Sequence, residues 1–183
     1  MKLLQTDIKD LFVVETDLVS DDRGAFSRLF CERELESVLK GRKIVQINRS
    51  LTIAPGTVRG MHYQHPPHAE TKLIRCIKGR VWDVAIDLRE GSPTLLQWHA
   101  EELSSQNARM LIVPEGFAHG FQVLEPDSEM LYLHTDYYAP EAEDGILSND
   151  SRLAISWPLP VANLSDRDKQ YSPIPQDFSG IKV

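Results

Sequence analysis

The chain has 183 residues, of which 42% are apolar and 26% charged, so it is neither a disordered nor a fibrous protein. Its formal net charge of −7 makes it a poor general binder of nucleic acid or of an anionic membrane. It contains no apolar run as long as a transmembrane helix, no apolar core of a signal peptide and only two cysteines, Cys31 and Cys76. We therefore expect a single domain over residues 1–183, located in the cytoplasm with both thiols free.

The predicted elements are mostly short strands. Leu11–Val19 is apolar and β-branched, which predicts a strand, and Asp21–Gly24 is typical of a turn. Glu32–Leu39 has apolar residues at helical spacing and is followed by Gly41, which predicts a short helix. Eight further strands are predicted at Ile44–Thr52, Val58–Gln64, Lys72–Lys78, Val81–Leu88, Thr94–Leu103, Arg109–Val113, His119–Leu124 and Glu129–Thr135. This pattern predicts an all-β sandwich or barrel, followed by an irregular C-terminal tail with at most one helical turn.

A histidine and a lysine on successive predicted strands are the first candidates for chemistry. In the segment Arg59-Gly60-Met61-His62-Tyr63-Gln64, strand alternation places His62 and Gln64 on one face. If that strand is continuous, Lys72 on the next strand faces the same cavity. A histidine base beside a lysine cation suits removal of a proton next to a carbonyl group, with the lysine stabilising the enolate oxygen. The alternative interpretation is a core histidine and a surface lysine.

A metal site is the second hypothesis. The side chains that could supply ligands are His62, His65, His68, Glu70 and His119. A regular strand points His65 away from His62, however, and the two prolines between His65 and His68 are typical of a turn. The sequence therefore favours a site without metal, and a metal-dependent enzyme is kept as the alternative.

Basic and phenolic side chains complete the candidates. The cations that could bind a phosphate are Arg23, Arg59, Lys72 and Arg167. Each of them alone is also explained as a surface charge, and Arg59 approaches His62 only if the backbone bends at Gly60. Tyr132 lies in an apolar strand, where it is either a core aromatic residue or a proton donor that faces the cavity.

Several motifs follow one another in order over nearly the whole chain. They are Asp22-Arg23-Gly24-x-Phe26, Gln46-Ile47-Asn48-Arg49-Ser50, Arg59 to Gln64, Lys72-Leu73, Gly79 to Arg89, Ser92-Pro93-Thr94, Pro114 to Phe121, Tyr137 to Pro140, Asn149-Asp150, Trp157-Pro158 and Leu164 to Asp168. Taken together they resemble the nucleotide-sugar epimerases typified by dTDP-4-dehydrorhamnose 3,5-epimerase. Pro114 to Phe121 also resembles the second motif of the cupin superfamily. The resemblance implies a cupin-type double-stranded β-helix, or jelly roll, a homodimer, and catalysis without metal or cofactor.

The resemblance also implies roles for individual residues. His62 is expected to remove protons alpha to the C4 ketone of a dTDP-4-keto-6-deoxy sugar, at C5 and C3, with Asp168 as its partner. Lys72 is expected to stabilise the enolate, and Tyr132 to return a proton to the opposite face. The expected substrate-binding residues are Arg23, Arg28, Gln46, Asn48, Arg59, His119, Tyr138, Glu143 and Arg167. Arg23 is expected to act across the dimer.

Three positions depart from the family pattern. Arg28 stands where the family usually has a glutamate, Ser148 where a tryptophan is usual, and Leu133 where a lysine commonly follows the tyrosine. The catalytic set is complete, so these departures bear on the substrate more than on the chemistry. The alternatives are a C3-only or C5-only epimerase of another nucleotide sugar, and a sugar-nucleotide binding module without catalysis.

Overall fold

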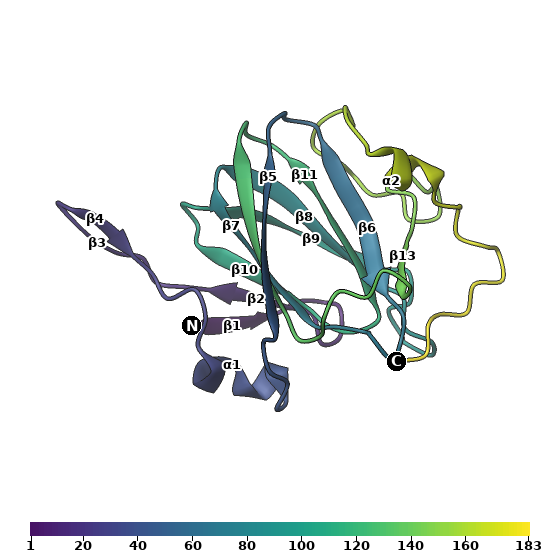
Figure 1. The fold of residues 1–183 in the computed structure, drawn as a ribbon, viewed down its shortest axis with the longest axis horizontal. Helices are drawn as coiled ribbons and strands as arrows, with labels where there is room; N and C mark the ends of the chain where they lie inside the picture. Colours follow the sequence, from purple (N-terminus) through teal and green to yellow (C-terminus); the bar gives the residue numbers. More distant parts are fainter.

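A computed structural model describes all residues 1–183 and contains two facing antiparallel sheets, a projecting hairpin and two short helices (Figure 1). The elements are β1 (Lys2–Gln5), β2 (Phe12–Glu15), β3 (Val19–Asp21), β4 (Gly24–Phe26), α1 (Glu32–Leu39), β5 (Gln46–Thr52), β6 (Val58–Gln64), β7 (Lys72–Lys78), β8 (Arg80–Asp87), β9 (Trp98–Ser104), β10 (Arg109–Val113), β11 (Phe117–Val123), β12 (Ser128–His134), β13 (Glu143–Gly145) and α2 (Asp166–Gln170). One sheet has the order β1-β2-β10-β7-β12-β5, and the other β13-β6-β11-β8-β9. The all-β prediction is confirmed. Neither helix has the length and hydropathy needed to cross a membrane.

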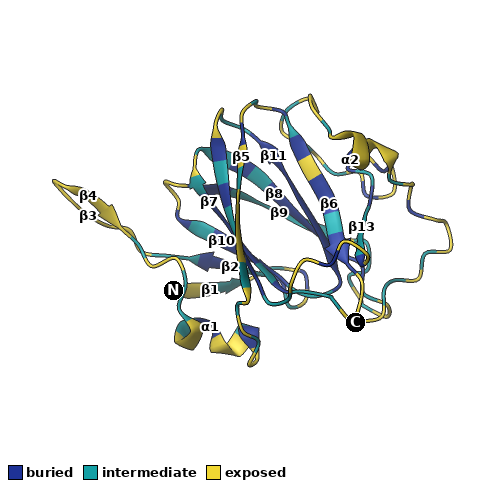
Figure 2. Cartoon of the chain, viewed as in Figure 1, coloured by how far each residue is buried: buried dark blue, intermediate teal, exposed yellow.

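The main core lies between the two sheets. Ile74 and Leu111 of the six-stranded sheet meet Val81, Ala85 and Phe121 of the five-stranded sheet in one buried cluster. Because both faces of the central strand β11 are covered, all seven of its residues are buried. Figure 2 shows this core in dark blue and the projecting hairpin in yellow. Burial of these apolar faces is what fixes the register of the strands that carry polar groups into the cavity.

Helix α1 forms where the sequence predicts it and packs outside the six-stranded sheet. Leu35 and Leu39, one turn apart, are fully buried in a cluster with Leu73 and Met110, while half of the helix residues are exposed. The helix ends at Lys40, which has left-handed backbone angles and donates its backbone N–H to the Glu36 carbonyl. Gly41, the predicted stop signal, follows directly.

Two predicted strands are too long. Leu11–Val19 contains only β2 and the first residue of β3, because the chain leaves the sheet after Glu15 and forms the separate hairpin β3–β4. The predicted turn at Asp21–Gly24 joins the two strands of this hairpin, which projects away from the sheets (Figure 1). The apolar composition of Leu11–Val19 predicts strand, but it does not show that β2 pairs within the large sheet while β3 pairs only with β4.

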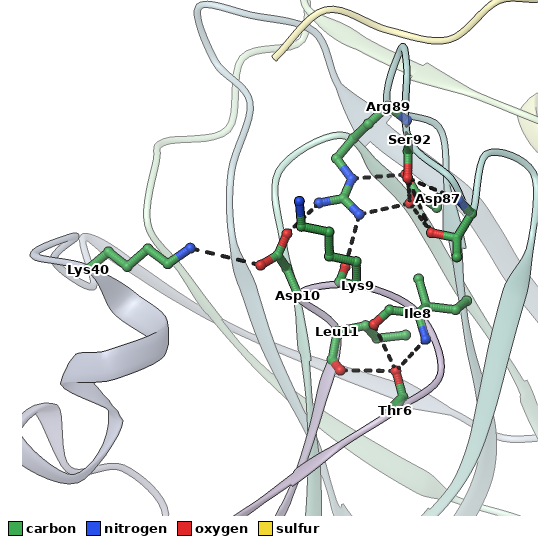
Figure 3. Close-up of polar contacts among 10 residues, drawn as sticks. Thr6, Ile8, Lys9, Asp10, Leu11, Lys40, Asp87, Arg89 and Ser92 are labelled. Atoms are coloured by element: carbon green, nitrogen blue, oxygen red, sulfur yellow. Dashed lines mark hydrogen bonds and ion pairs between the residues drawn. The ribbon is translucent and has the colours of Figure 1, made fainter.

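Thr94–Leu103 is the second strand predicted too long, since β9 begins at Trp98. The preceding residues form a turn, in which the Ser92 and Thr94 hydroxyls donate to the Asp87 carboxylate at 2.6 and 2.7 Å. Arg89 binds the same carboxylate and also Asp10, at 2.8 and 2.9 Å, and so fastens the N-terminal loop to the end of β8 (Figure 3). Side-chain hydrogen bonds replace strand pairing in this segment.

The C-terminal tail packs on the outside of the five-stranded sheet. Leu153 and Ile174 join Met61 and Ile86 in a second buried cluster. Within the tail, Ser165 caps α2 by accepting the backbone N–H of Asp168 at 3.1 Å. This helix supplies the single helical turn expected in the tail, and it brings Asp168 beside β6.

Candidate active site

A cavity of about 690 Å³ opens between the two sheets and is lined by both of them and by α2. Ten of the predicted site residues line it: His62, Lys72, Tyr132, Asp168, Asn48, Arg59, His119, Tyr138, Glu143 and Arg167. Polar residues from distant parts of the sequence therefore converge on one site, because the two sheets bring their strands together.

His62 and Asp168 form a pair at one wall of the cavity. The Nε2 atom of His62 lies 2.8 Å from Oδ1 of Asp168, whose side chain is only 3% exposed. Burial raises the pKa of Asp168, but the hydrogen bond and charge of His62 outweigh burial, so the pKa of this carboxyl lies below its usual value. Asp168 is thus ionised and holds the proton on Nε2, which leaves Nδ1 as the nitrogen that can act as a base.

A bulge in β6 brings Arg59 to the same cavity. His62 is paired with His119 of β11, but Phe121 is paired with Arg59, so three steps along β6 match two along β11. The backbones of β6 and β11 approach each other closely here, since a Cβ atom at Gly60 would lie 2.5 Å from the Cα atom of Gly120. This is the bend at Gly60 on which the sequence interpretation of Arg59 depended.

Tyr132 lies on the facing sheet, on β12. Its hydroxyl group is 2.9 Å from that of Ser50 on β5. Burial raises the pKa of Tyr132 well above its usual range. The phenol is therefore protonated and can donate its proton to a ligand in the cavity, across from His62.

Lys72 belongs to a buried polar cluster that sequence reasoning missed in part. Its Nζ atom lies 3.2 Å from Oε1 of Glu70, and Oε2 of Glu70 lies 2.6 Å from Nδ1 of His134. The sequence predicts Glu70 only as a candidate metal ligand, and it does not predict a role for His134. The available signal was strand alternation, because His134 follows Tyr132 by two residues and so shares its face.

His119 is held by a second carboxylate that the sequence reading did not identify. Its Nε2 atom lies 3.0 and 2.9 Å from the two oxygens of Asp83. Asp83 is completely buried, and this burial raises its pKa despite the opposing effect of His119. An aspartate inside the apolar run of β8 was the signal for this pair.

Two cations stand near the cavity mouth. Arg167 binds Glu143 at 2.7 Å, and its Nη2 atom lies 3.2 Å from Nε2 of His62. Tyr138 donates its hydroxyl group to the same Glu143 carboxylate at 2.8 Å. Arg59 is oriented by Thr52, whose hydroxyl accepts its Nε–H at 2.8 Å. Both arginines line the cavity, where a guanidinium group can donate to an anionic ligand.

Three predicted binding residues lie outside this cavity. Arg23 is on the projecting hairpin, 90% exposed and paired with Asp21. Arg28 pairs with Glu34 of α1. Gln46 accepts the backbone N–H of Tyr138 at 3.2 Å and so supports the loop that carries this tyrosine. Within one chain, neither Arg23 nor Arg28 lines the cavity.

The candidate metal ligands do not converge on one point, although His62, Glu70 and His119 all line the cavity. His65 lies near Asp144 and His68 near Asp136, both at the surface, whereas Glu70 and His119 have the partners described above. No group of three or more His, Cys, Asp or Glu side chains is arranged to hold a metal ion. The donor set proposed for a metal-dependent enzyme is therefore not assembled.

Comparison with known proteins agrees with this geometry. The family model described as dTDP-4-dehydrorhamnose 3,5-epimerase matches residues 5–176. The enzyme of that name from Pseudomonas aeruginosa is 45% identical over 93% of this chain and 94% of its own. A Legionella pneumophila enzyme solved in complex with dTDP-4-keto-L-rhamnose superposes with a TM-score of 0.91, at 37% identity, covering 100% of this chain and 98% of the other. A Bacillus anthracis enzyme solved with TDP and PPi bound gives a TM-score of 0.91 at 40% identity, covering 94% of this chain and 99% of the other. With its cupin jelly roll and its matching motifs, the chain belongs to the dTDP-4-dehydrorhamnose 3,5-epimerase family of carbohydrate epimerases.

Proposed function

We propose that this protein inverts C3, C5 or both in a dTDP-4-keto-6-deoxy sugar by way of an enolate. The observation that carries the proposal is the placement of a base, His62, and an acid, Tyr132, on the two facing sheets with Lys72 in the same cavity. Inversion requires that a proton leaves one face of a carbon and returns to the other. Two groups on opposite walls meet that requirement.

The reaction follows from the protonation states of these groups. Nδ1 of His62 accepts the proton from the carbon next to the ketone, and the released electron pair forms a carbon–carbon double bond as the C4 oxygen becomes an enolate. The ammonium group of Lys72 stabilises this oxygen, and Asp168 stabilises the imidazolium. Tyr132 then donates its proton to the opposite face of the carbon and the C4 ketone reforms. The resting enzyme is restored when the imidazolium loses its proton and the phenolate regains one.

The mouth of the cavity supports binding of a nucleotide diphosphate. Arg59 and Arg167 present guanidinium groups, which match phosphate oxygens with paired donors. The volume of about 690 Å³ is in the range of small-molecule sites. The chain is acidic as a whole, but these local cations are sufficient for one anionic ligand.

We also propose that the protein acts as a homodimer. Strand β5 is at the edge of the six-stranded sheet and exposes Ile47 and Leu51, and Ile53, which follows the strand, is exposed as well. The hairpin exposes Val19 and Phe26 on a projecting arm. An edge strand with an apolar face favours pairing with a second chain. Such an arrangement would give Arg23 a route to the partner's cavity.

Solvent exchange in deuterated water tests the proposed reaction. We expect dTDP-4-keto-6-deoxyglucose to gain deuterium at C3, C5 or both when incubated with the protein. Exchange at one carbon alone would define a mono-epimerase. Absence of exchange at both carbons, with the ligand bound, would contradict the proposal for this substrate and support a binding module.

A further inference from the structure

A buried carboxylate beside the expected enolate site needs an explanation. The Glu70 side chain is 7% exposed and lies on the cavity wall next to Lys72. Its negative charge opposes both an anionic ligand and the developing enolate, and it partly offsets the lysine cation. A carboxylate with this effect alone would weaken binding and catalysis. The contacts of Glu70 with Lys72 and His134 suggest what else it does.

Glu70 bridges two groups with its two oxygens. Oε1 faces Nζ of Lys72 at 3.2 Å, and Oε2 faces Nδ1 of His134 at 2.6 Å. Burial raises the pKa of Glu70, but the hydrogen bond from His134 and the charge of Lys72 outweigh burial and lower it. The carboxylate is therefore ionised and accepts from both neighbours.

His134 is itself fixed. It is the register partner of Lys72 across β12 and β7, and its ring stacks on Tyr132 with centroids 6.2 Å apart. Its Nε2 atom faces the side-chain amide of Asn48 at 3.4 Å, so Nδ1 carries the proton given to Glu70. The histidine thus holds the carboxylate in one orientation.

We propose that Glu70, locked by His134, is a positioning residue that holds the Lys72 ammonium where the enolate oxygen forms. A lysine has a flexible four-carbon stem with many rotamers, and this freedom is lost when the side chain is fixed. In an open cavity an untethered ammonium would be spread over several positions. The Glu70–His134 pair places it before the substrate arrives, which is the condition for strong electrostatic stabilisation.

This inference rests on the proposed function, and its first test does not require turnover. In ¹⁵N-labelled full-length protein, a held and shielded Lys72 ammonium should give a slowly exchanging NMR signal, assigned by its loss in Lys72→Ala. We expect Glu70→Gln to abolish the signal, because the glutamine presents either an NH₂ group to the ammonium or no acceptor to His134. We expect His134→Leu to abolish it too, whereas His134→Asn, which keeps a donor near the position of Nδ1, should retain it.

The second test is kinetic. Glu70→Gln should lower kcat between about tenfold and a hundredfold, with KM changed less than about twofold. In the Lys72→Ala background the same change should have almost no further effect, since the positioned group is gone. Glu102→Gln, which removes a carboxylate that pairs with Arg80 outside the cavity, should match wild type in both tests.

The outcomes separate the two proposals. A signal that is absent in wild type, or that persists in Glu70→Gln, overturns the positioning role whatever the activity. Additive losses in the double variant, which would indicate a structural role, also overturn it. A wild-type protein that shows the signal but exchanges no substrate proton refutes the proposed function and leaves the positioning of Lys72 supported by the NMR test.

Discussion

Two histidine–carboxylate pairs stand side by side in this molecule and differ in character. His62 and His119 are register partners on adjacent strands, and each binds an aspartate through Nε2. The pKa of Asp168 lies below its usual value, however, and that of Asp83 above it. The same two residue types therefore behave in opposite ways within one cavity wall.

The surroundings of each carboxylate account for this difference. Asp168 comes from a capped helix in the tail and receives a further N–H from Gly60 at 3.4 Å. Asp83 is in the middle of β8 and is completely buried, so the cost of removing its charge from water prevails. Asp168 suits the support of an imidazolium during catalysis, whereas Asp83 suits the fixed orientation of His119.

The largest expected effect comes from removing the proposed base. His62→Ala should reduce substrate deuterium exchange by more than about a thousandfold, because it removes the proposed base, whose imidazolium form is stabilised by the ionised Asp168. The matched change His119→Ala should cost less than about a tenth of that factor, since it removes a binding contact. Rates in deuterated water measure both variants. Equal losses of exchange rate in the two variants would contradict the assignment of His62 as the base and His119 as a binding residue.

Asp168→Asn should have the next largest effect. The amide keeps the size of the carboxylate but cannot stabilise the imidazolium, and it can hold the wrong tautomer, so kcat should fall by about 10²- to 10⁴-fold. Steady-state kinetics, with the melting temperature as a check on folding, measure this. A loss below about threefold would mean that Asp168 is structural.

Asp83→Asn should have a much smaller effect. The asparagine oxygen still accepts the Nε2 proton of His119, so kcat should change less than about fivefold. Because the folded pKa of Asp83 is raised, ionisation costs stability as the pH rises above its unfolded value. Removing the charge should therefore leave the free energy of unfolding at pH 7 within about 1 kcal/mol of wild type, or increase it. Urea unfolding decides the sign, and a large destabilisation would show that the ionised pair holds β8 and β11 together.

The smallest expected effect is on the pH dependence of stability. Since the folded pKa of Asp168 is lowered, its contribution to stability is fully present above the unfolded pKa of about 3.9 and is lost as the pH falls through the folded value. The difference in unfolding free energy between wild type and Asp168→Asn should thus shrink below about pH 4. A difference that stays constant down to pH 2 would contradict the lowered pKa.

Sequence reasoning identified one member of each functional pair more readily than the other. His62 follows Gly60 and His119 lies between Gly116 and Gly120, in motifs that pointed to a cavity. Asp168 was assigned only through the family resemblance, because 106 residues separate it from His62. Asp83 was missed, since a single acidic residue in an apolar run does not reveal its partner on the next strand.

The sequence by itself determined the all-β fold class, the exact helix Glu32–Leu39 and most strand positions, and it singled out His62, Lys72 and Tyr132 as candidates for the chemistry. These depend on local periodicity and on motifs whose residues are neighbours in the chain. Only the tertiary structure decided that a bulge at Gly60 turns Arg59 into the cavity, that Glu70 and His134 hold Lys72, and that Arg23 lies away from the site of its own chain. Those outcomes depend on strand register and on burial, which long-range packing sets and local sequence does not encode.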